Sequence, residues 1–253
     1  MAKSSLDIIY EDDDIVIVNK PAGMLTIADR FRADIPSVIA ELRKKYKDIL
    51  TVHRLDKDTS GVICFARNAS AHRHLSKQFE DHTPMKVYWL LVEGNMEPGS
   101  EGIIDAPLME NEARLGTMRV SKTGKPSLTT YKAVAHFRHF SIVEATPKTG
   151  RTHQIRVHLA HIGYPPAVDK YYGQREKLFL SDIKQRKFNL KKHTQELPLL
   201  DRVPLHALSL TIQHPTTLQA MTFEAPLTKD LAATTKQLSK WDGLKPTLDI
   251  DLD

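Results

Sequence analysis

Short apolar runs rich in β-branched residues alternate with polar turns along most of the 253-residue chain. The run at residues 14–19 is stopped by Lys20-Pro21-Ala22-Gly23, so it predicts a buried strand that ends in a turn. Four further strands are predicted at Lys86–Glu93, Phe140–Ala145, Leu205–Gln213 and Gln219–Glu224. Strands therefore account for most of the predicted elements.

Three segments show helical spacing instead. Residues 37–46 place their apolar positions on one helix face. Ser70 is predicted to be the N-cap of a second helix, which has apolar residues at every fourth position. A third helix is predicted over Thr152–Ile162 and is closed by Gly163.

The predicted strands outnumber the helices and do not alternate with them regularly. This order favours an α+β fold with a mostly antiparallel mixed sheet, flanked by helices and loops. No internal repeat or Pro/Gly/Ser-rich linker divides the chain, so we expect one domain over residues 1–253. The acidic end, with Asp249, Asp251 and Asp253, is predicted to be a loose tail.

The composition mainly excludes classes of protein, namely disordered, disulfide-stabilised, membrane-spanning and secreted ones. Hydrophobic residues make up 41% and charged residues 26%, which is typical of a folded protein. The single cysteine, Cys64, excludes an intramolecular disulfide framework and fits a reducing compartment. No apolar run is long enough for a membrane span, and the N-terminus lacks the pattern of a secretory signal. We therefore expect a cytoplasmic protein.

The net charge of +5 is unevenly distributed. Residues 1–29 are acidic, whereas residues 150–193 hold ten basic and three acidic residues. Such a run is either a solvated face or a surface that binds a polyanion, and charge alone favours the solvated face. The same segment holds His153, His158 and His161, whose spacing does not match the four-residue gap of a helical zinc pair. No metal is expected, and a metal hydrolase is the alternative for this cluster.

The chain lacks a P-loop, a G-x-G-x-x-G fingerprint and a G-x-S-x-G elbow, so no nucleotide cofactor is expected. Residues 53–61, HRLDKDTSG, carry the most informative sequence. A tight turn explains part of this segment. It does not explain Arg54 and Asp56, which place charge in a loop that leads into a strand-like run.

This segment resembles the H-R-L-D-x-x-T-S-G motif of the RluA-type RNA pseudouridine synthases, and further motifs follow in the order of that family. The further matches are residues 19–23 (N-K-P-x-G), 86–88 (K-x-Y), 124–131 (loosely, G-K-x-A-x-T-x-Y), 150–158 (G-R-T-H-Q-I-R-x-H), and 205–207 with 214–215 (L-H-A and H-P). The resemblance covers roughly residues 6–226. It implies a pseudouridine-synthase-like catalytic domain without the extra N-terminal RNA-binding module of many relatives.

Two departures concern the segment after the third predicted helix. Residues 163–169 read GYPPAVD where relatives commonly read G-H-P-[IL]-x-G-D. The stretch that follows, Lys170–Arg202, is a long basic insert. These changes bear on the choice of RNA target rather than on the chemistry.

The resemblance also implies roles for single residues. Asp56 would be the carboxylate that acts either at C1′ or on a glycal-forming path, and Arg156 would be its ion-pair partner. In isolation, Arg156 would instead be interpreted as a phosphate contact. Tyr88 would stack on the flipped base or take a proton at C2′, or it is an ordinary tyrosine of a half-buried strand.

A base inside an RNA helix must be extruded before it can react. Arg54 would then fill the vacated place, because a guanidinium plane can stack there. Lys20 and the basic residues of 150–193 would hold phosphates. Leu205 would pack against the base or be an ordinary core leucine. The remaining motif residues expected at the RNA are His53, Arg151 and Gln154.

The expected partner is structured RNA, either a tRNA stem-loop or large-subunit ribosomal RNA, bound by a monomer. The alternative is a non-catalytic RNA-binding or RNA-chaperone module on the same fold. That alternative predicts the loss of Asp56, Tyr88 or Arg156, and all three are present.

Overall fold

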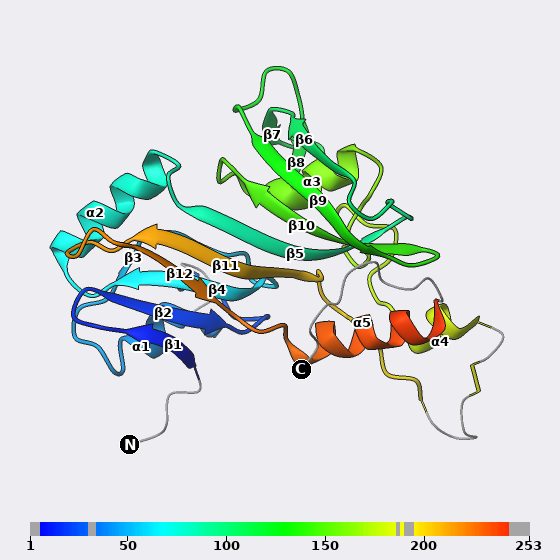
Figure 1. Cartoon of the computed structure of the whole chain (residues 1–253), viewed down its shortest axis with the longest axis horizontal. Coiled ribbons are helices and arrows are strands. Elements are labelled where there is room, and N and C mark those ends of the chain that lie inside the picture. The colour runs from blue at the N-terminus through cyan, green and yellow to red at the C-terminus, as the bar shows by residue number, and fades with distance from the viewer. Residues whose placement is uncertain (1–5, 30–33, 186–187, 190–194, 243–253) are drawn as a thin grey trace. The chain divides into compact units, whose positions relative to one another are not determined.

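The computed structural model describes residues 6–29, 34–185, 188–189 and 195–242 (Figure 1). By its internal contacts the chain divides into two compact units. Unit 1 comprises Met1–Tyr88 and Leu205–Pro226, and unit 2 comprises Trp89–Pro204 and Leu227–Asp253. The predicted acidic tail and part of the basic insert lie outside the described residues. The fold is α+β with mostly antiparallel strand pairs, as the hydrophobic pattern predicts.

Unit 1 contains a sheet in the order β1–β2–β4–β11, with β3 beside β4 and β12 beside β11. Its strands are β1 (Asp7–Glu11), β2 (Ile15–Lys20), β3 (Leu50–Thr51), β4 (Ser60–Ala66), β11 (Leu205–Gln213) and β12 (Ala220–Glu224). Strand β2 pairs antiparallel with β4 along its whole length, whereas β11 runs parallel to β4. A parallel neighbour needs a long crossover, and residues 67–204 separate these two strands in the sequence.

Strands β2 and β4 are buried on both faces, so successive residues enter different cores. On one face they pack with helix α1 (Val38–Leu42), and on the other with helix α2 (Ala69–Glu80). The α1 side holds Val16, Val18, Ile63 and Phe65, and the α2 side holds Ile15, Ile17, Val62 and Cys64. The strand predicted at residues 14–19 is therefore confirmed as a buried one.

The ends of the first two helices differ from the prediction. Helix α1 ends at Leu42 because the backbone tightens there, and the N–H of Lys45 donates to the carbonyl of Leu42. Helix α2 is capped by Asn68, not by Ser70 as predicted. The Asn68 side-chain oxygen accepts from the N–H of Ala71 at 2.8 Å, which leaves Ser70 inside the first turn.

Unit 2 contains the strands β10 (Phe140–Pro147), β9 (Leu128–His136) and β6 (Glu101–Asp105), which follow β5 in the sheet. Strand β5 (Met85–Glu93) starts in unit 1 and continues into unit 2. A hairpin joins β7 (Leu108–Glu110) to β8 (Met118–Val120). Helix α3 (Gln154–His161) lies against β8, β9 and β10 (Figure 1). It starts two residues later than predicted because His153, its N-cap, adopts a left-handed backbone conformation.

The described part of the basic insert folds against the C-terminal helix of unit 2. Helix α4 (Leu180–Lys184) lies beside α5 (Lys229–Trp241), as Figure 1 shows. Arg202 makes a two-pronged contact with Asp230 at 2.7 and 3.1 Å, and the Lys184 ammonium lies 4.2 Å from the centre of the Trp241 ring. Among the described residues, no helix is both long and apolar enough to cross a membrane.

Candidate active site

Asp56 lies in the loop between β3 and β4, and its neighbours are held on both sides. Leu55 is buried in the core on the α1 side, while Asp56 itself is only partly buried. The N–H of Thr59 donates to the carbonyl of Asp56 at 3.2 Å and closes a turn. The buried leucine and the closed turn together restrict where the Asp56 carboxylate can point.

The end of this loop is fixed by β11, the strand that carries the L-H-A motif. Ser60 Oγ lies 2.9 Å from His206 Nδ1, and the other ring nitrogen of His206 lies 3.1 Å from the carbonyl of Ala225. Gly61, at a φ of +107°, lies so close to Ala207 that a Cβ would sit 2.1 Å from its carbonyl oxygen. The T-S-G and L-H-A motifs are therefore the two sides of one strand contact.

The start of the loop is fixed by His53. Its Nε2 accepts the N–H of Cys64 at 3.0 Å, and its ring stacks on Phe79 with 4.4 Å between centres. Burial, with a smaller contribution from the charge of Lys86, lowers the pKa of His53 to about 3. His53 is therefore neutral at pH 7, and its ring holds the start of the loop against Cys64 and Phe79. Its contact with RNA stays a prediction.

Lys20 was predicted to hold a phosphate, and this prediction is wrong. The side chain is fully buried, and its ammonium donates to the carbonyls of Pro21, Met24 and Lys57 at 2.7–3.0 Å. An ammonium has three protons to donate, and three carbonyls receive them. The N–H of Gly23 also donates to Lys57, at 2.9 Å. The N-K-P-A-G segment thus holds the loop just beyond Asp56.

Tyr88, near the start of β5, lies within electrostatic range of Asp56 and packs against the same core as Leu55. Burial raises the pKa of the Tyr88 hydroxyl, and the Asp56 charge raises it further. The phenol therefore stays protonated at neutral pH. The stacking of Tyr88 on the base and its proton transfer at C2′ both stay predictions.

Arg156, on helix α3 of unit 2, is paired within that unit with Asp169. Its Nε and one terminal nitrogen donate to the two carboxylate oxygens at 2.7 and 3.0 Å, and both side chains are buried. The guanidinium carbon also lies 5.0 Å from the centre of the Tyr172 ring. This pairing fixes the plane of the guanidinium. The partnership of Arg156 with Asp56, a residue of unit 1, stays a prediction.

Gln154 was expected at the RNA, and the structure contradicts this. The side chain is buried, and its amide is saturated by the protein. Its oxygen accepts from Thr149 Oγ1 and from the N–H of Arg151, and its nitrogen donates to the Leu128 carbonyl and Thr129 Oγ1. Gln154 therefore joins helix α3 to strand β9 and has no capacity left for RNA.

The three histidines of the predicted cluster, His153, His158 and His161, lie in different surroundings. His158 is fully buried, with its ring nitrogens 2.9 Å from Thr129 Oγ1 and 3.0 Å from the Ala106 carbonyl. His153 Nδ1 lies 2.8 Å from the Tyr172 hydroxyl, and His161 is exposed. No group of three His, Cys, Asp or Glu residues in the described part of the chain is placed to hold a metal ion.

The other predicted RNA contacts differ in their exposure. Arg54 is exposed on the Asp56 loop. Arg151 is partly buried, and its Nε donates to the Pro126 carbonyl at 3.2 Å. Leu205, the first residue of β11, is buried, as an ordinary core leucine would be. Its packing against a base stays a prediction. Arg175, within the basic insert, is bound to Glu93 at 2.7 Å.

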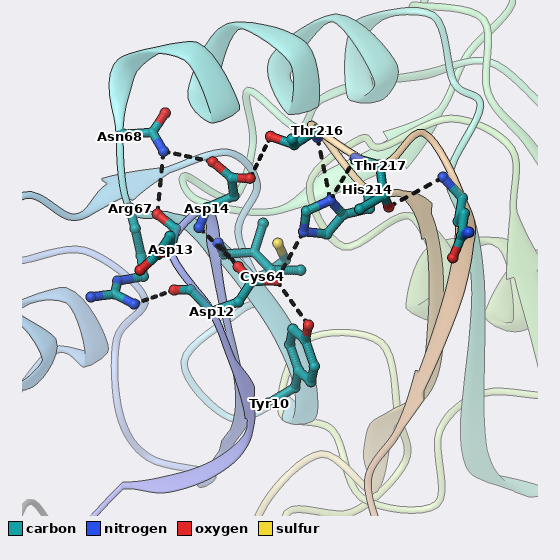
Figure 2. A network of polar contacts seen from close by, with 12 residues as sticks. Tyr10, Asp12, Asp13, Asp14, Cys64, Arg67, Asn68, His214, Thr216 and Thr217 are labelled. Carbon is teal, nitrogen blue, oxygen red and sulfur yellow. Dashed lines mark hydrogen bonds and ion pairs between the residues drawn. The ribbon is translucent and has the colours of Figure 1, made fainter.

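The H-P motif has a structural role at the opposite end of β11 from His206. His214 Nε2 lies 2.9 Å from Asp12 Oδ2, and Nδ1 accepts the N–H groups of Thr216 and Thr217 (Figure 2). Asp12 belongs to the β1–β2 turn and also accepts from the Tyr10 hydroxyl. This network ties two turns of unit 1 together, away from Asp56.

Comparison with known proteins agrees with the motifs. Residues 14–161 match the family described as RNA pseudouridylate synthase. A curated relative from Salmonella typhimurium, named dual-specificity RNA pseudouridine synthase RluA, is 36% identical over 87% of this chain and 93% of that protein. The chain therefore belongs to the RNA pseudouridylate synthase family.

Longer relatives and solved structures give the same result. The ribosomal large subunit pseudouridine synthase C of Vibrio parahaemolyticus is 37% identical over 88% of this chain, which spans 66% of that relative. The solved structure of human RNA pseudouridylate synthase domain containing 1 matches with a TM-score of 0.70 and 26% identity. This match covers 98% of the present chain and 92% of the human one.

Proposed function

We propose that this protein isomerises uridines in RNA to pseudouridine, with Asp56 as the reacting carboxylate. The observation that carries the proposal is the placement of Asp56 in a loop held at both neighbouring residues, within electrostatic range of Tyr88. A partly buried carboxylate within electrostatic range of a tyrosine suits a flipped base, which needs a stacking surface and a group that acts at the sugar.

The reaction that this site would perform is an isomerisation. The N1–C1′ bond breaks, the base turns, and a C5–C1′ bond forms. C5 then loses its hydrogen as a proton, and N1 ends with a proton. No electrons are gained or lost, so the balance needs no redox cofactor. Asp56 would act at C1′ or on a glycal-forming path, and Arg156, oriented by Asp169, would stabilise the negative charge of Asp56.

The proposed substrates are a tRNA stem-loop, large-subunit ribosomal RNA, or both. The names of relatives support an RNA substrate, since they include a dual-specificity RNA enzyme and ribosomal large subunit enzymes, and the latter support ribosomal RNA. We further propose that the protein acts as a monomer in the cytoplasm, where its one buried cysteine, Cys64, would stay reduced.

Two measurements test the proposal together. Purified protein is mixed with total RNA in which uridine carries tritium at C5, and release of tritium to water is followed. Pseudouridines are then mapped in RNA from cells with and without the gene. We expect tritium release and at least one uridine whose modification depends on the gene. RNA binding without tritium release would instead support the non-catalytic alternative.

A further inference from the structure

Thr26, a residue outside the matched motifs, makes a two-way contact with the residue before Asp56. Its hydroxyl donates to the carbonyl of Leu55 at 2.9 Å and accepts the N–H of Leu55 at 3.1 Å. Both bonds are buried, and Thr26 is only 3% exposed. One side chain therefore satisfies both backbone groups of Leu55, as a neighbouring strand would.

Leu55 depends on this contact because it lies between strands rather than in one. Strand β3 ends at Thr51 and β4 begins at Ser60, so no ladder partner is provided for Leu55. A buried backbone N–H or carbonyl without a partner is costly. The Leu55 side chain is already fixed in the core with Val38 and Ile39. Thr26 holds the Leu55 backbone as well. The position and direction of the next residue, Asp56, are therefore restricted.

Thr26 is itself tied to the start of helix α1. The N–H of Ile39 donates to the carbonyl of Thr26 at 3.2 Å, and the N–H of Val38 donates to Leu25 at 2.8 Å. The contact therefore runs from the first turn of α1 through Thr26 to Leu55. A rigid helix start, rather than a neighbouring loop alone, sets the position of the Asp56 backbone.

We propose that Thr26 is a positioning residue that holds Asp56 in its reactive place through the backbone of Leu55. This proposal rests on the proposed function of Asp56. A displacement of a reacting group by about 1 Å can cost about 100-fold in rate, while RNA bound elsewhere on the protein is unaffected. The loss should therefore fall on the chemical step and not on RNA binding.

The test compares Thr26→Val, which keeps the shape and removes the hydroxyl, with Thr26→Ser, which keeps the hydroxyl. Single-turnover tritium release from C5-labelled RNA, with enzyme in excess, reports the chemical step. Filter binding of the same RNA reports affinity. Thr235→Val is the matched control, because Thr235 is a buried threonine of α5 whose hydroxyl donates to the Leu231 carbonyl.

We expect Thr26→Val to slow tritium release by about 100-fold with affinity changed less than about threefold. Thr26→Ser and Thr235→Val should stay within about threefold of the wild type. If Thr26→Val does not fold, Thr26→Cys carries the test, since a thiol bonds weakly at similar volume. Equal rates for wild type and the Val or Cys variant would overturn the proposal, as would a loss that Thr26→Ser shares. Absence of release from the wild type would overturn the proposed function instead.

Discussion

The imidazole of His53 accepts the backbone N–H of Cys64 at 3.0 Å, at the point where strand β3 stops pairing with β4. Leu50 and Thr51 pair with Ala66 and Phe65, and the side chain of His53 then replaces the next ladder contact. The chain after His53 therefore leaves the sheet and forms the loop that carries Asp56. This contact needs a neutral ring, because Nε2 must be unprotonated to accept the hydrogen bond from the N–H of Cys64.

We predict that His53 makes the stability of the protein depend on pH below about 6.5. Its pKa is about 3 in the folded protein and 6.5 ordinarily, so between these values the unfolded chain binds a proton that the folded protein does not. Stability from this group is complete above pH 6.5 and falls by up to about 1.4 kcal/mol per pH unit below it. Urea unfolding of wild type and His53→Gln at pH 7.5, 6 and 5 measures it. Identical slopes in the two proteins would refute the prediction.

We predict that Asp169→Leu destabilises the protein by about 3–5 kcal/mol, because it removes the two-pronged carboxylate contact from the buried Arg156 guanidinium. The double variant Arg156→Met with Asp169→Leu should recover part of this loss, since the buried guanidinium is removed as well, while the N–H of Tyr171 still lacks its Asp169 acceptor. The control is Glu41→Gln, which breaks the exposed pair with Lys44 and should cost less than about 1 kcal/mol. Urea unfolding distinguishes these outcomes. An Asp169→Leu cost as small as the control would contradict a structural role for the pair.

Much of the fold could be predicted where apolar residues follow a clear period. Strand β2 is apolar on both faces and was predicted almost to the residue. Helix α5 was missed because its buried face includes Thr234 and Thr235, whose hydroxyls donate to carbonyls four residues earlier. Those threonines are polar in the sequence and satisfied in the helix, so hydrophobic periodicity alone does not reveal them.

The motifs identify the residues of the candidate site but not whether each residue contacts RNA or holds the protein structure. Lys20 and Gln154 have the side-chain chemistry of RNA contacts, yet both are buried and fully bonded within the protein. Their partners lie elsewhere in the chain, as Lys57 does for Lys20, and a single sequence does not show which carbonyls come together. No sequence pattern indicates the role of Thr26, because this role depends on a contact with Leu55, 29 positions away.

We predict that Lys20→Met lowers stability but leaves the salt dependence of RNA binding unchanged. The substitution removes the donors of three carbonyls without removing any phosphate contact. Binding is measured between low and high salt at a temperature where circular dichroism shows the variant folded. A slope of log affinity against log salt that is smaller by about one would restore Lys20 as a phosphate contact.

We predict that Arg54→Ala reduces activity more on a structured stem-loop than on the same RNA loosened by mismatches. Arg54 is exposed and would fill the place of the extruded base, which matters only where a stack must be maintained. Lys57→Ala, at another exposed residue of the loop, is the control and should affect both RNAs equally. Tritium release from the two RNAs provides the ratio. Equal losses for Arg54→Ala on both RNAs count against insertion.

We predict that Asp56→Asn abolishes most of the activity while the protein stays folded. The amide has nearly the same shape as the carboxylate but no negative charge, so a loss of about 100- to 10,000-fold in tritium release is expected. RNA affinity should change little, because the loop contacts at Leu55 and Lys57 use backbone groups that the substitution leaves in place. Asp58→Asn, the same change two residues further along the loop, should retain activity within about tenfold. Normal pseudouridine formation by Asp56→Asn would remove Asp56 from the reaction. An equal loss from Asp58→Asn would instead indicate that the loop responds to charge in general.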